Sequence, residues 1–418
     1  MTDEVHWFVG IDWASEQHRV RVLDAEGRSV AERDVAHNGD GLSELCTWLL
    51  KMTAARPEQI AVAIETPRGP VVEVLLERGF AVFAINPKQL DRFRDRFTVA
   101  GAKDDSRDAL VLACSLRTDR NAFRHLKLDD PLVIELREWS RMHDNLQQER
   151  NRLANRMREQ LWRYYPQVLE LNDDLAADWV LELWGQVPTP AKAARVSEGK
   201  IERILKAHRI RRINAAEALR ILRAKPLWVA PGTAEAASAH IRTLAARLHL
   251  VNQQIKDSEQ RLDQLCGAIE LSAETAPGQI CEQRDVAILR SCPGLGRINI
   301  ATLLAEGSDL LQRRDYQALR ALSGVAPVTR SSGKQCIVIR RHACNKRMAN
   351  ALFHWARVAT QYDPASQQYY AQLRRRGHSH ARALRSIGDR LLYVLCTLLE
   401  RQTLFDPDYK STQMAAAA

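Results

Sequence analysis

Apolar positions in the first 120 residues alternate between two spacings, one typical of strands and one typical of helices. Short apolar or alternating runs predict strands at residues 5–12, 18–24, 29–36, 60–65 and 80–86. Stretches with helical spacing predict helices near residues 41–52, 70–79, 88–97 and 105–116. Three strands in a meander, followed by alternating helices and strands, is the order of the ribonuclease H-like fold. We therefore expect an α/β domain over residues 1–125.

The middle of the chain, residues 126–275, has the pattern of long helices. The first covers about 130–165, and the second carries a heptad seam sustained over about four repeats. The seam fits either an antiparallel hairpin within one chain or a dimerisation coiled coil, and we favour self-association as a dimer or tetramer. Its positions are Ile241, Leu244, Leu248, Val251, Ile255, Ser258, Leu262 and Leu265.

An insertion over residues 165–235 separates the two long helices. It is polar, it contains the basic segment KAHRIRR at 206–212, and prolines interrupt it at 188, 190, 226 and 231. A small helical insertion that contacts nucleic acid fits this composition. A surface excursion, meaning a segment that extends over the protein surface without a binding role, fits it as well. Both interpretations stay open.

The last domain, residues 280–410, is predicted to be mostly helical. Its segment LRSCPGLGRINIATLLAE at 289–306 has the pattern of a helix-hairpin-helix motif. The turn would place the backbone N–H groups of Gly294 and Gly296 at a helix start, where they can bind a phosphate without reading bases. A plain connection between two helices fits the same glycines.

Charge is distributed unevenly along the 418 residues. The whole chain has a formal net charge of +10. Residues 320–390 contain 14 Lys or Arg and two acids, which gives them +12 and leaves the remainder at about −2. Such a concentration indicates a nucleic-acid-binding surface, although a solvated basic face gives the same pattern.

Cysteine spacing and the length of apolar runs bear on the class of protein. The eight cysteines include no Cys-x-x-Cys pair, which predicts reduced and mostly buried thiols. A zinc site at Cys336, His342 and Cys344 lacks a fourth ligand at suitable spacing, so we favour structural roles there. The acidic N-terminus is unlike a signal peptide and no apolar run is long enough to span a bilayer, so we expect a cytoplasmic protein without membrane partners.

Four acids occupy positions where an uncompensated carboxylate would be costly. Asp12 ends the first predicted strand, and Glu65 ends the fourth. Asp105 and Asp108 lie three apart on the last helix of the domain, and therefore on one face of it. Hard divalent cations take oxygen ligands, and paired ions recur in phosphodiester chemistry. The pattern predicts a site for one or two Mg²⁺ ions.

Two serines in the basic segment are candidates for a nucleophile. Ser331 and Ser332 precede Gly333. Arginines bind phosphates and stabilise charge that develops on them, so Ser332 could attack a DNA phosphate. A flexible Ser-Ser-Gly loop fits the spacing as well. The predicted phosphate-binding residues are Arg330, Lys334, Arg340, Arg341, Lys346 and Arg347.

Six segments together resemble one family. In order they are GIDWASE, AIETPRG, INPKQ, AKDDSRDA, PGLGRINIATLLAE and ALSGVAP…SSGK. They are similar in order and type to the DEDD transposases of bacterial insertion sequences, the bridge-RNA-guided recombinases, over about 1–120 and 285–405. The resemblance implies an N-terminal domain like the RuvC Holliday-junction resolvase, with the four acids as its catalytic positions. It also implies a C-terminal transposase domain whose nucleophile maps to Ser332, or to Ser331 if the register is shifted by one.

The same resemblance implies an enzyme that excises and inserts a mobile element by cutting and rejoining DNA. It implies Mg²⁺-dependent chemistry, a covalent phosphoserine intermediate, and a structured non-coding RNA that pairs with donor and target DNA. The RuvC-like site of one protomer would be completed by the serine domain of another, in a bacterial, nucleoid-associated protein. The insertion at 165–235 is longer than in compact members of the family. The resemblance therefore leaves open how the RNA is bound and how the protomers are arranged.

Three other functions are compatible with parts of the same sequence pattern. A metal-dependent junction endonuclease would need the acids but not Ser332. An actin-like ATPase also opens with Gly-Ile-Asp, but Trp13 and Glu16 follow here instead of a phosphate-binding turn. A non-enzymatic nucleic-acid binder would retain the fold without activity, and the presence of all four acids disfavours it.

Overall fold

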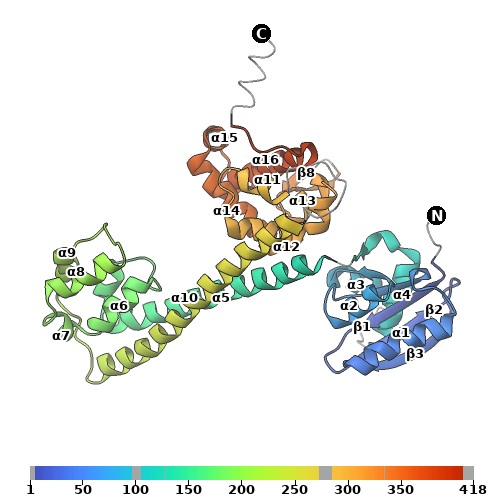
Figure 1. The fold of residues 1–418 in the computed structure, drawn as a ribbon, viewed down its shortest axis with the longest axis horizontal. Helices are drawn as coiled ribbons and strands as arrows, with labels where there is room; N and C mark the ends of the chain where they lie inside the picture. Colours follow the sequence, from blue (N-terminus) through green and yellow to red (C-terminus); the bar gives the residue numbers. More distant parts are fainter. Residues whose placement is uncertain (1–4, 97–104, 128, 273–284, 334, 408–418) are drawn as a thin grey trace, which may run out of the picture. The chain divides into compact units, whose positions relative to one another are not determined.

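The computed structural model describes residues 5–96, 105–127, 129–272, 285–333 and 335–407 (Figure 1). The chain forms two compact units, Met1–Asp129 and Asp130–Ala418, and each unit is described by itself. None of the helices within the described ranges is long and apolar enough to cross a membrane.

The first unit is built on a six-stranded mixed sheet in the order β3-β2-β1-β4-β5-β6. The strands are β1 (Trp7–Asp12), β2 (Gln17–Leu23), β3 (Ser29–Ala36), β4 (Ile60–Ile64), β5 (Ala81–Ala84) and β6 (Arg124–His125). The first three form an antiparallel meander, β4 and β5 run parallel to β1, and β6 returns antiparallel to β5. The expected mixed α/β domain is confirmed. Strand β6 is absent from the sequence prediction because two residues show no alternation.

Helices cover both faces of this sheet. They are α1 (Gly39–Thr53), α2 (Pro70–Glu77), α3 (Pro87–Arg94) and α4 (Asp105–Thr118), with 3-10 turns η1 (Pro57–Gln59) and η2 (Arg120–Ala122). Alternate strand residues point to opposite faces. One face buries Val9, Ile11 and Ile64 against α1 and α2. The opposite face buries Phe8 and Ala63 against α3 and α4, so these residues show which side of the sheet α4 occupies.

The second unit contains a pair of long helices, α5 (Pro131–Tyr164) and α10 (Thr233–Ser272), which lie side by side (Figure 1). Ion pairs join Glu135 to Arg261 and Glu149 to Arg247, so the helices are antiparallel. Every position of the predicted heptad seam is buried within the single chain. The antiparallel hairpin is therefore the correct interpretation, and our preference for a dimerisation seam at these residues is wrong.

The insertion between α5 and α10 is a compact helical body rather than a surface excursion. Its elements are η3 (Pro166–Glu170), α6 (Asp178–Gln186), α7 (Pro190–Ala193), α8 (Glu198–Ala207) and α9 (Ala215–Leu222). Trp179, Trp184 and Tyr165 are buried in its core, which is continuous with the adjoining ends of α5 and α10. The predicted basic segment contributes Arg212 to this body, where its guanidinium lies over the Trp179 ring.

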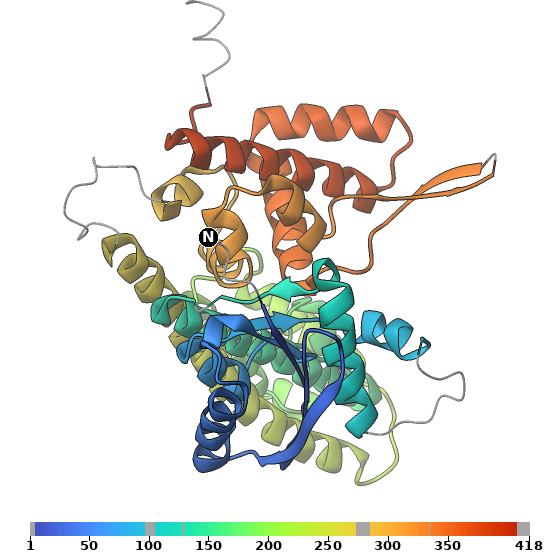
Figure 2. The same ribbon diagram turned by 90° about the vertical axis from the view of Figure 1, so that its right-hand side faces the viewer.

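The rest of the second unit is a helical cluster with one hairpin. Its helices are α11 (Asp285–Ser291), α12 (Arg297–Gln312), α13 (Tyr316–Leu322), α14 (Lys346–Tyr362), α15 (Pro364–Arg375) and α16 (His380–Arg401). They enclose the fully buried Trp355. The strands β7 (Val328–Ser332) and β8 (Gln335–Ile339) pair antiparallel and project from the helices (Figure 2). A mostly helical remainder is confirmed.

One buried acid ties this cluster to the long helices. Glu306 of α12 accepts hydrogen bonds from Arg141 of α5 at 3.1 Å and from the side chain of Asn345, the N-cap of α14, at 2.8 Å. Burial alone would raise the pKa of Glu306, but these donors and the charge of Arg347 hold its pKa below the usual value. The ionised carboxylate therefore joins α5, α12 and α14.

Replacing Leu248 by alanine tests the in-chain hairpin. Leu248 is fully buried, so Leu248→Ala should lower the free energy of unfolding by about 2–5 kcal/mol. Because its partner helix is in the same chain, the loss measured by urea denaturation should be independent of protein concentration. A loss that grows on dilution would show instead that the seam pairs between chains.

Candidate active site

The ends of two central strands bring two of the predicted acids to one edge of the sheet. In the parallel pairing of β1 with β4, Gly10 lies beside Ala63 and Ile11 beside Ile64. The next positions along the two strands are Asp12 and Glu65. Adjacent strands are about 4.8 Å apart, so the two carboxylates start from neighbouring backbone positions.

The alternation along each strand gives the direction of both acids. Phe8 and Ala63 point to the face covered by α4. Asp12 is four residues beyond Phe8, and Glu65 is two beyond Ala63, so continued alternation turns both toward the same face. The acids therefore point toward the start of α4, where Asp108 lies.

A glycine allows the backbone of α4 to lie directly on β1. A Cβ atom at Gly10 would be 1.9 Å from the Ala109 carbonyl oxygen and 2.7 Å from the Ala113 nitrogen. Any side chain at this position would therefore push the helix away. Asp108 precedes Ala109 in the first turn of α4 and is only 4% exposed. The close approach at Gly10 thus brings Asp108 to the edge that carries Asp12 and Glu65.

A guanidinium group lies among these acids. Arg94, the last residue of α3, donates from Nε to Oδ1 of Asp108 at 2.6 Å and from Nη2 to Oδ2 at 2.7 Å. It also pairs with Asp91. Burial would lower the pKa of Arg94, but the hydrogen bonds and charge of Asp108, with the charges of Asp91 and Glu65, raise it overall. The forked contact places a cation where the sequence predicts Mg²⁺.

The ligand set is only partly described. Asp105 is the first residue of α4, but its side chain and residues 97–104 lie outside the described part of the chain. Among the side chains that are described, no three of the His, Cys, Asp and Glu type form a group ready to hold a metal. The oxygen chemistry of Asp12, Glu65 and Asp108 and the bound guanidinium fit a hard cation at this edge.

A polar network connects the first turn of α4 to the meander. Arg21 of β2 donates to the Ser106 hydroxyl at 2.6 Å, and that hydroxyl donates to Glu32 of β3 at 2.6 Å. Glu32 is also paired with Arg21 and with Arg19, each at 2.7 Å. Sequence reasoning missed Arg94 and Arg21, because their partners are distant in sequence and neither carries a local motif.

The predicted nucleophile lies near the tip of the β7–β8 hairpin. Ser331 pairs with Cys336 and Ser332 with Gln335, and both serines are exposed. Gly333 follows with φ of +56°, a left-handed conformation that suits the tight turn. The two serines therefore end a paired strand, and Gly333 lies in the turn that follows it.

The predicted phosphate-binding residues separate into exposed and internal groups. Arg330, Arg340 and Lys346 are exposed, whereas Arg341 is half-buried with a long contact of 3.4 Å to the Ala326 carbonyl. Lys334 lies outside the described residues. Arg347 is directed inward: it contacts the Arg141 carbonyl at 3.0 Å and Asp144 at 3.1 Å. We therefore withdraw Arg347 from the nucleic-acid set.

The glycine turn before α12 is explained by packing. Gly294 has φ of +75°, and a Cβ there would be 2.7 Å from the Ala359 nitrogen on α14. Trp355 donates to the Pro293 carbonyl at 2.9 Å. Gly296 is the N-cap of α12.

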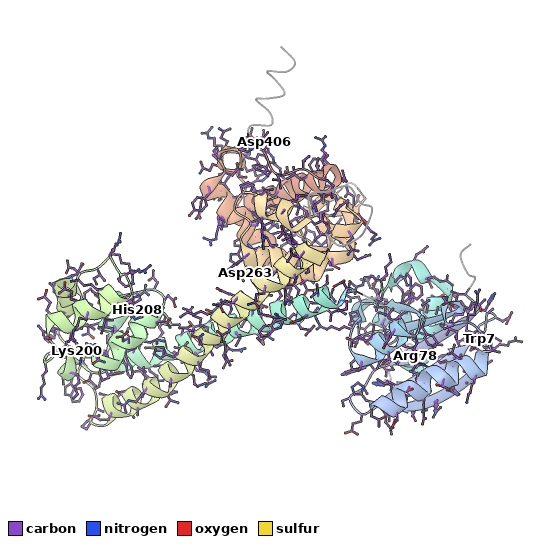
Figure 3. All side chains as sticks on the ribbon, in the orientation of Figure 1. Trp7, Arg78, Lys200, His208, Asp263 and Asp406 are labelled. Carbon is purple, nitrogen blue, oxygen red and sulfur yellow. The ribbon has the colours of Figure 1, made fainter. Side chains whose placement is uncertain are left out.

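Acids lie close to the start of α12. Arg297 is paired with Glu259 and with Asp263 on α10; Figure 3 labels Asp263 on this helix. Negative charge beside a helix N-terminus disfavours a phosphate there. Our prediction of phosphate binding by Gly294 and Gly296 is therefore not supported, and the plain helix connection fits better.

Closing the space at Gly10 tests its role in placing Asp108. Gly10→Ala should destabilise the protein by about 1–3 kcal/mol or more, because the methyl group overlaps the α4 backbone. Gly199→Ala in α8 is the matched control, since nothing lies within 4 Å of its Cβ position, and it should be neutral or stabilising by up to about 1 kcal/mol. Thermal unfolding measures both, and equal effects would contradict the close approach.

Two family models match the chain. One, for the DEDD transposases of the IS110 type, matches residues 9–166. The other, described as the transposase IS116/IS110/IS902 family, matches residues 286–371. The first segment contains all four predicted acids, and the second contains the β7–β8 hairpin.

Curated relatives match the chain over most or all of its length. "Mini-circle putative transposase for IS117" of Streptomyces coelicolor is 33% identical over 422 residues, which cover 100% of this chain and 99% of that protein. "Insertion element IS110 uncharacterized 43.6 kDa protein" of the same organism is 27% identical over 97% of this chain and 96% of its own length. "Putative transposase y4uE" of Sinorhizobium fredii is 57% identical over 236 residues, covering 56% of this chain and 64% of that protein. The chain therefore belongs to the IS116/IS110/IS902 family of transposases.

Proposed function

We propose that this transposase cuts and rejoins the DNA strands of an insertion sequence, with its acids holding one or two Mg²⁺ ions and Ser332 as the nucleophile. The observation that carries the proposal is that Asp12 and Glu65 follow each other's register at one sheet edge, while Arg94 binds Asp108 and feels the charge of Glu65. The DEDD transposase family is typically metal-dependent. We include in the proposal that this domain is RuvC-like; its six-stranded mixed sheet, with the antiparallel meander beside parallel β1, β4 and β5, supports that assignment.

The acids would hold the cation and, through it, the scissile phosphate. Bound Mg²⁺ would stabilise negative charge on the phosphoryl oxygens. Asp12 and Glu65 approach from the sheet, Asp108 approaches from α4, and Asp105 is proposed to join them. For Asp108 to act as a ligand, its forked contact with Arg94 must open. The network of Arg21, Ser106 and Glu32 would keep α4 in place while this happens.

Ser332 would carry the covalent step. Its hydroxyl oxygen forms a bond to phosphorus and gives up its proton, while the bond from phosphorus to the 3′ oxygen breaks and that oxygen takes a proton. A 3′ hydroxyl of the partner strand then attacks the phosphoserine, which restores the serine. The exposed Arg330, two residues before Ser332 on β7, would stabilise charge on the phosphate during both steps. Ser331 remains the alternative nucleophile.

The hairpin gives a reason to expect further partners. A two-stranded ribbon is marginally stable by itself. The apolar side chains of Ile337 and Val338 on β8 are also left 55% and 60% exposed. We propose that assembly of protomers on DNA and a structured guide RNA covers this hairpin and completes the site. Because α5 already occupies the heptad seam, a dimer or tetramer would have to form through other surfaces.

A second candidate function is a metal-dependent junction endonuclease without a serine intermediate. The exposed position of Ser332 favours this candidate, because its hydroxyl donates no hydrogen bond to a neighbouring base within the described part of the chain. A serine hydroxyl is a weak nucleophile until a base or a metal-bound phosphate activates the reaction. The two functions differ in whether a covalent adduct forms.

Trapping the adduct tests the proposed function. The protein is incubated with its guide RNA, Mg²⁺ and labelled donor and target DNA, and covalent protein–DNA species are separated under denaturing conditions. Ser332→Ala should reduce the adduct by about a thousandfold or more, because the nucleophile is removed. Ser331→Ala is the matched control and should retain it. Strand cleavage that persists in Ser332→Ala with free ends would support the endonuclease instead.

A further inference from the structure

A pocket of about 260 Å³ lies at the base of the β7–β8 hairpin, within the second unit. Its walls come from the chain that follows α13, from Arg340 just after β8, and from helices α14 and α16. No residue in its lining is an acid. The pocket shares no side chain with the acidic edge described for the first unit.

Two arginines give this pocket its charge. Arg340 and Arg385 both line it. Neither guanidinium has a hydrogen bond or ion pair to any residue that the structure describes, although most arginines of the second unit are paired. Burial lowers the pKa of Arg385, and the positive charges of Arg340 and Arg382 lower it further. Like charges held together without a counter-charge create a positive potential that an anion would relieve.

The remaining lining limits the kind of anion. Phe353 and Leu384 provide apolar walls, and Asn350 adds an amide. An apolar wall beside two guanidinium groups suits a phosphate that is attached to a sugar more than a free, fully hydrated ion. Arginine forks also match the paired oxygens of a phosphodiester.

The hairpin relates this pocket to the predicted nucleophile. Val328 pairs with Ile339 at the base, beside Arg340, and Ser332 pairs with Gln335 near the tip. Four residue steps along a strand cover roughly 13 Å. Successive phosphates of one strand in duplex DNA are about 3.4 Å apart along the axis. The pocket and Ser332 are therefore roughly 13 Å apart along the hairpin, a span of only a few nucleotides.

We propose that the Arg340–Arg385 pocket binds one backbone phosphate of a nucleic-acid strand, a few nucleotides from the phosphate that Ser332 attacks. The proposal rests on the proposed function for the identity of the strand, and it adds an anchoring site that fixes the register of that strand. It assigns Arg385 a binding role that the motif around the serine does not indicate.

Salt-dependent binding measured without divalent ions tests the pocket. Fluorescence anisotropy in EDTA would follow a labelled duplex with the element junction, and separately the guide RNA, over a range of KCl concentrations. Arg385→Gln and Arg340→Gln should each weaken binding about three- to tenfold. Each should also reduce the log–log salt slope by about 0.9 for the duplex or about 0.7 for a single strand. Arg385→Lys should retain part of the affinity.

The matched control is Arg382→Gln, which removes the same charge from the same helix but from outside the pocket lining. A specific pocket predicts a clearly smaller effect for this control. A loss confined to the duplex or to the RNA identifies the strand that the pocket holds. Equal losses in Arg382→Gln and Arg385→Gln would overturn the proposal in favour of a diffuse basic surface, and unchanged binding of both nucleic acids would overturn it outright.

Thermal unfolding separates loss of binding from loss of fold. Because Arg385→Gln removes repulsion between like charges, the variant should unfold at the same temperature as the parent protein or higher. Weak binding together with early unfolding would count against a binding role. The binding assay needs neither metal nor a covalent step. A negative result would therefore count against the pocket and would say nothing about the Ser332 adduct, which has its own test.

Discussion

The close approach of α4 to β1 at Gly10 is the constraint on which the candidate site depends. A glycine there lets the helix backbone lie against the strand, with no room for a single methyl group. That contact brings a buried Asp108 to the edge where Asp12 and Glu65 end their strands. Burying one carboxylate beside others is unfavourable without a counter-charge, and Arg94 supplies that charge through its forked contact. The contact between α4 and β1 at Gly10 therefore determines both the packing of the site and the position of its buried charge.

The second unit balances its charges differently at two places. At Glu306, two half-buried arginines and an amide satisfy one buried carboxylate and join three helices, so these charges stabilise the fold. At the base of the β7–β8 hairpin, Arg340 and Arg385 face a pocket without any acid in its lining. The first arrangement is complete within the chain, whereas the second is completed by an external anion. This difference distinguishes Arg347, which is internal, from Arg340, although both belong to the same basic segment.

The sequence was informative where the signal is local. Alternation identified five of the strands, because a period-two pattern depends only on neighbouring residues. The positions of Asp12 and Glu65 at strand ends followed from these strands. The heptad positions of α10 were also correct, but the partner was not, since a seam looks the same whether it packs on another chain or on α5. Arg94, Arg21 and Arg385 could not be found, because each depends on contacts between residues far apart in sequence. Gly294 was misread because a glycine needed for packing on α14 resembles one that binds phosphate.

We propose that Asp12, Glu65 and Asp108 form a cation site that Arg94 occupies in the absence of metal. Crystals of the protein soaked in Mn²⁺ and measured by anomalous diffraction test it directly. A cation site there predicts a peak within about 2.5 Å of carboxylate oxygens of Asp12 and Asp108, with the Arg94 guanidinium moved off Asp108. Arg94 still forked on Asp108, with Mn²⁺ bound elsewhere or not at all, would contradict it.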